Sequence, residues 1–232
     1  MKTKHAMIEW FGPVLLEYYA ASEGGVGIEI TSNEWLQKPG SVGRVPDLDA
    51  FRVLNDDGEL VPSGVSGKLY LAAPPENPFV YYKAPEKTSE SFIGNFFWLG
   101  DIGYVDDDGY LYLTGRSAEC IISGGVNIYP SEIDAILIGH PAIHDVCTVG
   151  IPDDRETGNM GELVHAVISV NSGFQQSDNL VEEILSFAQE NLSKFKCPQS
   201  ISVVDEVPRL PSGKIVRARV REPFWAGREK SI

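Results

Sequence analysis

The pattern of apolar and polar positions divides the 232-residue chain into three stretches of different character. In the first, Ala6, Met7 and Trp10 recur at helical spacing and predict a short amphipathic helix. An apolar strand over 13–19 ("PVLLEYY") and a polar, glycine-rich turn over 20–27 ("AASEGGVG") follow it. Because a strand needs neighbours to pair with and no other strand precedes this one, it is an odd beginning for a domain.

The second stretch, 40–115, alternates short apolar strands with turns. Its strongest signals are two Asp-Gly pairs between apolar runs, in "NDDG" (55–58) and "DDDG" (106–109), and each predicts a β-hairpin. The proline-rich "APPENP" (73–78) is typical of a surface loop. We therefore predict a small antiparallel, barrel-like β subdomain.

The third stretch follows Arg116 and mixes strands with helices. A helix is predicted from Pro130, and a second over 178–192 with Asp178 as its N-cap. Four strands are predicted, in the order "ECIIS", "HDVCTVGI", "ELVHAVISV" and "SISVVD". The chain as a whole is therefore expected to be an α+β protein.

Charge narrows the range of partners. Asp and Glu outnumber Lys and Arg by 33 to 19, a formal net charge of −14, which argues against a nucleic-acid partner or an anionic membrane. The apolar start of the chain is interrupted by Glu9, Pro13 and Glu17, so we predict neither a signal peptide nor a transmembrane segment. Anionic ligands would have to meet local positive groups.

The three cysteines, Cys120, Cys147 and Cys197, lie far apart and form no Cys-x-x-Cys pair. This spacing excludes the usual zinc and dithiol motifs and favours a reduced, cytoplasmic protein. The four histidines are scattered, and none pairs with a nucleophile in the sequence.

The segment "YYAASEGG" places an aromatic residue, a hydroxyl and a carboxylate directly after an apolar strand. Ligand sites of α/β sheets are commonly built at strand ends. Tyr19 is suited to stacking on a flat ring, Ser22 to bonding a phosphate oxygen and Glu23 to holding a divalent cation. A polar turn without a ligand is the alternative.

Two further segments carry candidate groups. In "WLGDIGYVDDDGYLYLTGR", Asp101 is expected in a Gly-Asp turn, where its carboxylate can accept hydrogen bonds from both hydroxyls of a ribose. Arg116 in the same segment can bind a phosphate. In "ISGGVNIYP", Ser123, Gly124 and Gly125 allow another chain or a ligand to approach the backbone closely. Ordinary turn chemistry is the alternative for both segments.

Lys214 lies in "PRLPSGKIVR" near the end of the chain. The segment lacks the first glycine of a Walker loop, so a phosphate loop of that kind is excluded. By itself, the segment is compatible with a surface lysine on a hairpin.

Together, in this order, the four segments resemble the C-terminal portion of the adenylate-forming (AMP-binding) superfamily. This superfamily includes acyl- and aryl-CoA synthetases, fatty-acid–CoA ligases, luciferase and peptide-synthetase adenylation domains. The resemblance implies that Tyr19 stacks on adenine, Ser22 contacts phosphate and Glu23 helps to bind Mg²⁺. It also implies that Asp101 binds the ribose and that Arg116 contacts the nucleotide.

The resemblance further implies that Ser123, Gly124 and Gly125 lie beside the pantetheine tunnel and that Lys214 enters the site for adenylation. The implied reaction converts a carboxylic acid, ATP and coenzyme A into acyl-CoA, AMP and pyrophosphate. Lys214 and Glu23 are the implied catalytic residues. A fatty acid is slightly favoured over an aryl acid as the substrate.

In domain terms, the resemblance implies that 1–115 is the end of a large AMP-binding domain, 116–118 a hinge and 119–232 a small mobile domain. Three positions depart from the family pattern. Ala20 replaces the usual glycine of the first segment. Ala118 stands where the family usually has Asp or Lys, and Trp98 stands where a small residue is common.

The family's lysine-containing phosphate loop and most of its acyl pocket lie upstream of every segment present here. We therefore expect the chain to be inactive without a separate N-terminal half. Two alternatives stay open: a non-catalytic nucleotide- or CoA-binding or interaction module, and an adenylating enzyme with a carrier-protein acceptor.

Overall fold

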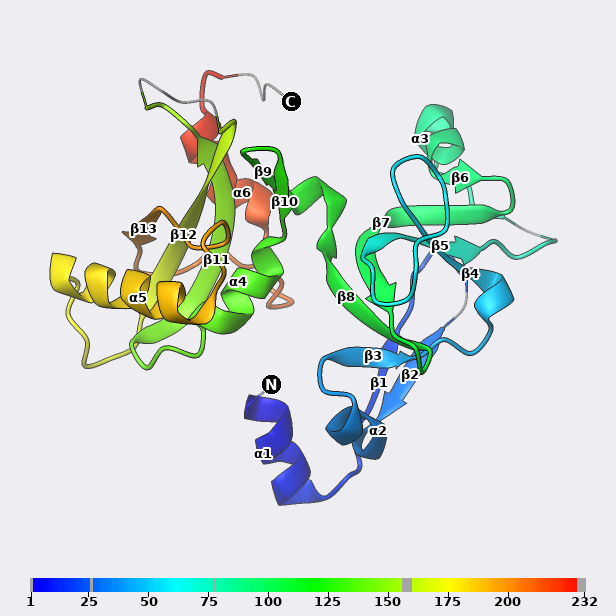
Figure 1. The fold of residues 1–232 in the computed structure, drawn as a ribbon, viewed down its shortest axis with the longest axis horizontal. Helices are drawn as coiled ribbons and strands as arrows, with labels where there is room; N and C mark the ends of the chain where they lie inside the picture. The colour runs from blue at the N-terminus through cyan, green and yellow to red at the C-terminus, as the bar shows by residue number, and fades with distance from the viewer. Residues whose placement is uncertain (1, 26, 77, 156–159, 229–232) are drawn as a thin grey trace. The chain divides into compact units, whose positions relative to one another are not determined.

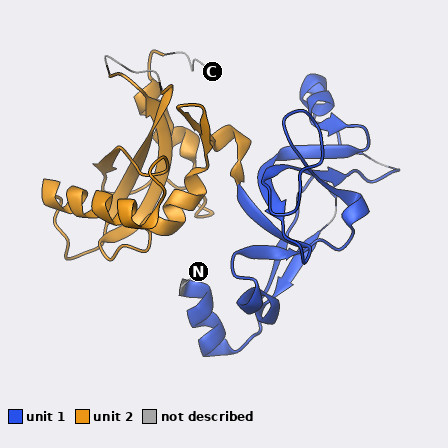
Figure 2. Ribbon diagram, in the orientation of Figure 1, with its two compact units in different colours: residues 1–114 blue, residues 115–232 orange. Residues whose placement is uncertain are grey.

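The described part of the chain forms two compact units in a computed structural model (Figure 2). Unit 1 covers residues 1–114 and unit 2 covers residues 115–232. The residues that the structure describes are 2–25, 27–76, 78–155 and 160–228. The predicted hinge over 116–118 stays a prediction.

Unit 1 is built on an antiparallel sheet with strand order β3-β8-β7-β5-β4, and β6 pairs with β7 (Figure 1). The strands are β3 (Ser41–Arg44), β4 (Phe51–Leu54), β5 (Gly67–Ala72), β6 (Phe92–Ile93), β7 (Phe96–Val105) and β8 (Tyr110–Arg116). Short helices η1 (Leu48–Ala50) and α3 (Pro85–Glu90) lie in its connections. The sheet packs around Phe51, Leu69, Leu71, Phe97 and Leu111. The antiparallel β subdomain expected from the sequence is confirmed.

The start of unit 1 adds a second, two-stranded sheet. Helix α1 (Lys2–Phe11) confirms the amphipathic helix, and β1 (Leu16–Tyr19) occupies the last four residues of the predicted strand. The partner of β1 is β2 (Ile28–Thr31), which the sequence analysis did not find. Helix α2 (Ser32–Gln37) follows β2 and begins with a capping box between the Thr31 and Glu34 side chains.

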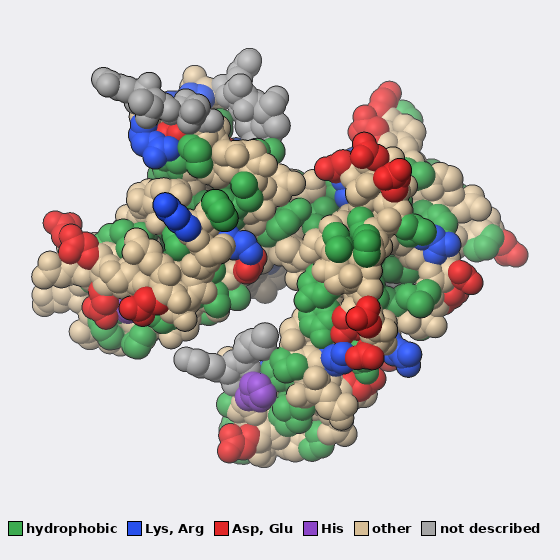
Figure 3. Space-filling model, in the orientation of Figure 1, with side chains coloured by type: hydrophobic (Ala, Val, Ile, Leu, Met, Phe, Trp, Pro, Cys, Tyr) green, Lys and Arg blue, Asp and Glu red, His purple; other side chains and the backbone are tan. Residues whose placement is uncertain are grey.

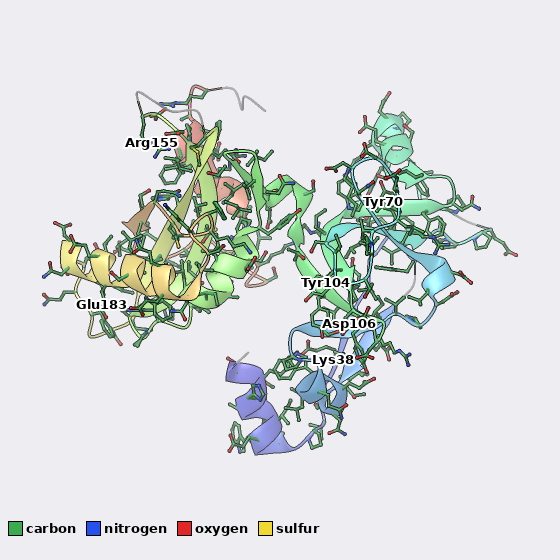
Figure 4. The ribbon with its side chains drawn as sticks, viewed as in Figure 1. Lys38, Tyr70, Tyr104, Asp106, Arg155 and Glu183 are labelled. Carbon is green, nitrogen blue, oxygen red and sulfur yellow. The ribbon has the colours of Figure 1, made fainter. Side chains whose placement is uncertain are left out.

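Both Asp-Gly turns are present, but they differ. At 106–109 the turn joins β7 to β8, and one Asp106 carboxylate oxygen accepts the N–H groups of Asp108 and Tyr110 at 3.0 and 2.9 Å. The other carboxylate oxygen of Asp106 accepts a 2.8 Å hydrogen bond from the Lys38 ammonium group (Figure 4). Asp106 is therefore a structural residue of the hairpin tip. The turn at 55–58 is followed by a single bridge, between Leu54 and Leu60.

Unit 2 is a sheet of β11 (Ile143–Pro152), β12 (Glu162–Val170) and β13 (Ser200–Val203) with helices on both faces (Figure 1). Alternate residues of the strands point to opposite faces. Those on one face pack with α4 (Pro130–Leu137) and α5 (Asp178–Asn191), namely Val146, Val164, Ala166 and Ile168. On the opposite face of the sheet, strand residues Cys147, Val149 and Val167 pack with α6 (Arg217–Trp225). Unit 2 is the expected α+β domain.

Two details of unit 2 differ from expectation. Helix α5 is capped by Ser177, whose hydroxyl accepts the N–H of Leu180, so Asp178 is the first helical residue and not the cap. The last helix, α6, was not predicted, because it contains Pro223 and four charged residues among its nine, and so shows little helical periodicity.

Within the described residues, no helix combines the length and apolar character required to cross a membrane. Acidic side chains are spread over both units on the face shown in Figure 3, as the net charge of −14 leads one to expect.

Candidate functional site

In unit 1 the fold brings Tyr19 and Asp101 together. Tyr19 is the last residue of β1, and its phenol donates a 2.8 Å hydrogen bond to Asp101 Oδ2. Asp101 lies inside β7, at a bulge where the pairing with β5 shifts from Lys68–Ile102 to Tyr70–Trp98. The turn predicted for Asp101 is thus wrong. The bulge turns the side chain out of the regular alternation of the strand, which is a common use of bulges beside functional sites.

Trp98 supports this bulge. Its indole N–H donates to the backbone carbonyl of Asp101 at 2.8 Å, and its ring stacks on Tyr70 with centroids 6.2 Å apart (Tyr70 is labelled in Figure 4). Gly100 adopts a φ of +95°, a conformation that glycine adopts without strain. The tryptophan at this unusual position therefore has a local structural role in holding Asp101.

Glu23 accepts two side-chain hydrogen bonds, from the Ser22 hydroxyl at 2.9 Å and from the Tyr81 phenol at 3.0 Å. Burial raises the pKa of Glu23, but these bonds, a backbone N–H and the positive charge of Lys87 together hold that pKa below its usual value. Lys87 also lies over the Tyr81 ring, 4.1 Å from its centroid. The carboxylate is therefore ionised and oriented.

The sequence analysis missed Tyr81. It lies 58 residues from Glu23, in an irregular segment where nothing in the local pattern distinguishes it from Tyr82. In the described part of the chain, no group of three or more His, Cys, Asp or Glu side chains is arranged to hold a metal. One ionised carboxylate is nevertheless a suitable protein ligand for Mg²⁺, which usually takes its other ligands from phosphates and water.

In unit 2, Ser123 is the last residue of β9 (Ile121–Ser123), and Gly124 and Gly125 form the turn to β10 (Val126–Ile128). The φ values of Gly124 and Gly125 are +58° and +79°, as two-residue hairpin turns of the primed type require. The Gly124 N–H donates to the Met160 carbonyl at 2.8 Å, and the Ser123 side chain is buried. The turn is therefore tied to the backbone at Met160.

Lys214 follows a tight turn. The N–H of Gly213 donates to the Leu210 carbonyl at 2.8 Å, and the N–H of Leu210 donates to the Lys214 carbonyl at 2.9 Å. Residues Arg209 and Ile215 form the bridge below the turn. The Lys214 side chain is exposed, and its ammonium group makes no hydrogen bond or ion pair to any described residue. We call residues 209–215 the Lys214 hairpin.

Arg116 is the last residue of β8 and has an exposed side chain, and η2 (Ser117–Glu119) follows it. Glu119, at the end of η2, accepts a 2.8 Å hydrogen bond from Arg217 Nε. Arg217 also donates to Asp134 at 2.6 Å and to the Thr148 carbonyl at 3.0 Å. Although burial lowers the pKa of Arg217, its acidic neighbours raise it overall. This arginine, which the sequence analysis did not single out, joins η2, α4, β11 and α6.

The structure therefore places the predicted residues in two groups. Tyr19, Ser22, Glu23 and Asp101 belong to unit 1, and Arg116, Ser123, Gly124, Gly125 and Lys214 belong to unit 2. Within unit 1, Tyr19 is bonded to Asp101 and Ser22 to Glu23. The functional roles of all these residues stay predictions.

Comparison with known proteins defines the class. Residues 132–214 match the family described as the AMP-binding enzyme C-terminal domain. The chain is 36% identical, over 78% of its length, to a fatty acid–[acyl-carrier-protein] ligase from Streptomyces coeruleorubidus. It is 32% identical, over 91% of its length, to a long-chain-fatty-acid–CoA ligase from Mycobacterium tuberculosis.

The fold comparison agrees. The o-succinylbenzoate coenzyme A synthetase from Bacillus subtilis, solved in complex with ATP and a magnesium ion, matches with a TM-score of 0.78 and 25% identity over 94% of this chain. The chain therefore belongs to the adenylate-forming superfamily and corresponds to its C-terminal portion. It spans 33% and 40% of the length of the two ligases named above, and 43% of the solved synthetase.

Proposed function

We propose that this chain supplies the C-terminal part of an ATP-dependent, AMP-forming acyl-CoA synthetase. The observation that carries the proposal is the pairing of Tyr19 with Asp101 in unit 1, in a chain that also presents an exposed Lys214 at a hairpin in unit 2. These are the residue types that the superfamily resemblance assigns to nucleotide binding and to adenylation.

In the proposed first step, a carboxylate oxygen of the acid attacks the α-phosphorus of ATP, and pyrophosphate leaves. Asp101 would accept the ribose hydroxyls, the Tyr19 ring would cover the adenine, and the Arg116 guanidinium would contact the nucleotide. The Lys214 ammonium would stabilise the negative charge that develops during the attack. By analogy with oxyanion-hole donors, such a group contributes roughly 3–4 kcal/mol to the transition state.

Ser22 and Glu23 would act at the phosphates. Ser22 would contact a phosphate oxygen, and Glu23 would hold Mg²⁺, which neutralises phosphate charge when bound. Support comes from the ionised state of Glu23, which its hydrogen bonds to Ser22 and Tyr81 favour. In the second step, the coenzyme A sulfur attacks the acyl carbonyl and AMP leaves, with the Ser123–Gly125 turn beside the pantetheine arm.

The acid is proposed to be a fatty acid, because both ligases that we compared by sequence are named for fatty acids. Their acceptors differ, however. The relative with 36% identity is named for an acyl carrier protein, so a carrier-protein acceptor is the second candidate function. A comparison of coenzyme A with acyl carrier protein as the thiol substrate separates the two.

We further propose that a separate N-terminal portion completes the site and covers the face formed by α1 and β1. Large apolar side chains are exposed there, with Trp10, Val14 and Tyr18 at 81%, 70% and 76% exposure. Among the described residues, β1 pairs only with β2, so the other edge of β1 has no strand beside it and is available for pairing. Large exposed apolar patches are typical of interaction surfaces.

The test is ATP–pyrophosphate exchange. The isolated chain is compared with a chimeric protein in which it replaces the matching C-terminal portion of the mycobacterial ligase, and with the same chimera carrying Lys214→Ala. We expect exchange in the chimera, and little in the isolated chain or in the Lys214→Ala chimera. A folded chimera without exchange would contradict the proposed function, and strong exchange by the isolated chain would contradict the need for an N-terminal portion.

A further inference from the structure

The Arg209 side chain binds two different parts of unit 2 at once. Its Nε and Nη2 donate to the two oxygens of Asp145 at 2.7 and 2.6 Å. Its Nη1 donates to the backbone carbonyl of Gly213, the residue directly before Lys214. Asp145 belongs to β11, which forms the sheet of unit 2, so one guanidinium connects that sheet with the Lys214 hairpin.

The remaining contacts leave the tip of the hairpin dependent on this connection. At its base, Ile215 packs against the buried cluster that contains Val207 and Val220. The turn itself, "PSG" at 211–213, is exposed, and among the described residues its backbone bonds run only within the hairpin. Arg209 is thus the side chain that ties the carbonyl next to Lys214 to the sheet.

We propose that Arg209 is a positioning residue for Lys214, fixing through Asp145 and the Gly213 carbonyl the direction in which the lysine leaves the hairpin. The inference rests on the proposed function, because it assumes that Lys214 takes part in adenylation. It assigns no contact with substrate to Arg209.

The chemistry of the guanidinium explains why this role suits an arginine. Its planar fork can bind a carboxylate with two parallel bonds and still direct another N–H group to a carbonyl. A lysine at 209 keeps the charge but cannot make this set of bonds from one rigid plane. An exposed ion pair adds little to overall stability, so the main consequence of the contact is the geometry of the hairpin.

The hydrogen bonds of Arg209 also act on Asp145. Burial raises the pKa of the Asp145 carboxyl, but Arg209, the Val146 N–H and His144 together hold that pKa below its usual value. The carboxylate is therefore ionised at neutral pH and available to bind the guanidinium.

The first test uses the full chain and needs no activity. Hydrogen exchange is measured at the amides of Leu210 and Gly213 in Arg209→Lys and in Asp145→Asn. The matched control is Arg155→Lys, because Arg155 forms a similar two-bond pair with Asp153 but not with the hairpin. We expect about tenfold faster exchange in the first two variants, the scale of a lost charge-assisted bond, and no change in the control. Unchanged exchange in both hairpin variants would overturn the proposal.

The second test uses the chimeric enzyme. Arg209→Lys should lower the rate of ATP–pyrophosphate exchange about tenfold, since small misplacements of a catalytic group have effects of this size or larger. The KM for ATP and thioester formation from supplied acyl-AMP should be unchanged. In a Lys214→Ala background, Arg209→Lys should cause no further loss, because its effect acts through the lysine.

The outcomes distinguish the two proposals. Equal loss in both half-reactions, or additive losses in the double variant, would show that Arg209 does not act through Lys214. A wild-type chimera that folds but shows no exchange would contradict the proposed function instead. The amide measurement decides whether Arg209 fixes the hairpin in either case.

Discussion

The Tyr19 phenol donates a 2.8 Å hydrogen bond to the Asp101 carboxylate, across 82 positions of sequence. The two residues come from different sheets of unit 1, β1–β2 and the larger antiparallel sheet. A ring proposed to cover adenine and a carboxylate proposed to bind ribose are therefore linked directly, without a ligand. One carboxylate oxygen is used in this contact, which orients the group.

This contact gives a graded prediction for nucleotide binding. Asp101→Ala removes the proposed ribose acceptor, so the Kd for ATP of the chimeric protein should rise about tenfold or more, the scale of a hydrogen bond to a charged group. Tyr19→Phe keeps the ring and loses only the orienting bond, so its effect should be clearly smaller. Calorimetric titration with ATP measures both. Equal losses in the two variants would contradict these assignments.

Lys214→Ala should lower adenylation by about a hundredfold and spare thioester formation from supplied acyl-AMP, since the lysine is proposed to act on charge that develops in the first step. The control is Lys194→Ala, another exposed lysine of unit 2 outside the Lys214 hairpin. The two half-reactions are assayed separately. If both slow equally, the lysine has another role.

Tyr81→Phe should weaken the apparent affinity for Mg²⁺ in adenylation. The substitution removes one bond that holds the Glu23 carboxylate and that lowers its pKa. We expect the Mg²⁺ concentration for half-maximal rate to rise by about threefold to tenfold, and the loss of activity at acid pH to begin at a higher pH. Tyr82→Phe is the control, because Tyr82 is 86% exposed and lies next to Tyr81 in the chain. An identical Mg²⁺ response in the two variants would remove Tyr81 from the site.

His165 predicts a pH dependence of stability. Its ring lies between the hydroxyls of Ser200 and Ser202, at 2.7 and 3.0 Å, and burial lowers its pKa to about 4. Because the pKa of the folded state lies below the unfolded value of 6.5, the neutral ring stabilises the fold above that value. The stabilisation is lost as the pH falls from about 6.5 towards 4.

Between pH 7 and pH 5 this loss should amount to about 2 kcal/mol of unfolding free energy. Urea unfolding at the two pH values measures it. His165→Asn should flatten the difference, whereas substitution of the exposed His144 by Asn should leave it in place. A His165→Asn protein with the wild-type pH dependence would exclude this histidine as the cause.

Sequence reasoning worked best where the determining interactions are local. The helices at Lys2–Phe11 and Pro130–Leu137 and the strands β9, β11, β12 and β13 follow from apolar periodicity and from the residues at their ends, whereas β10 was not predicted. It was less successful where local and tertiary effects compete. Asp101 follows a glycine and suggests a turn, but pairing with β5 keeps it inside β7 as a bulge.

The candidate site shows the same division. The residue types at 19, 22, 23, 101 and 214 and their order indicate nucleotide chemistry through a family resemblance. The sequence carried no signal for Tyr81 or Arg217. Each lies far along the chain from the carboxylates it binds, so the local sequence pattern around it does not indicate the contact.

By itself, then, the sequence determined the kinds of element, the positions of most turns and the superfamily, because short-range periodicity, turn residues and residue order are written along the chain. Only the tertiary structure decided which distant side chains meet. Tyr19 bonds Asp101, Tyr81 bonds Glu23, and Arg209 links Asp145 to the carbonyl before Lys214. Contacts of this kind depend on how strands pair and helices pack, and local sequence patterns do not determine which distant residues are brought together.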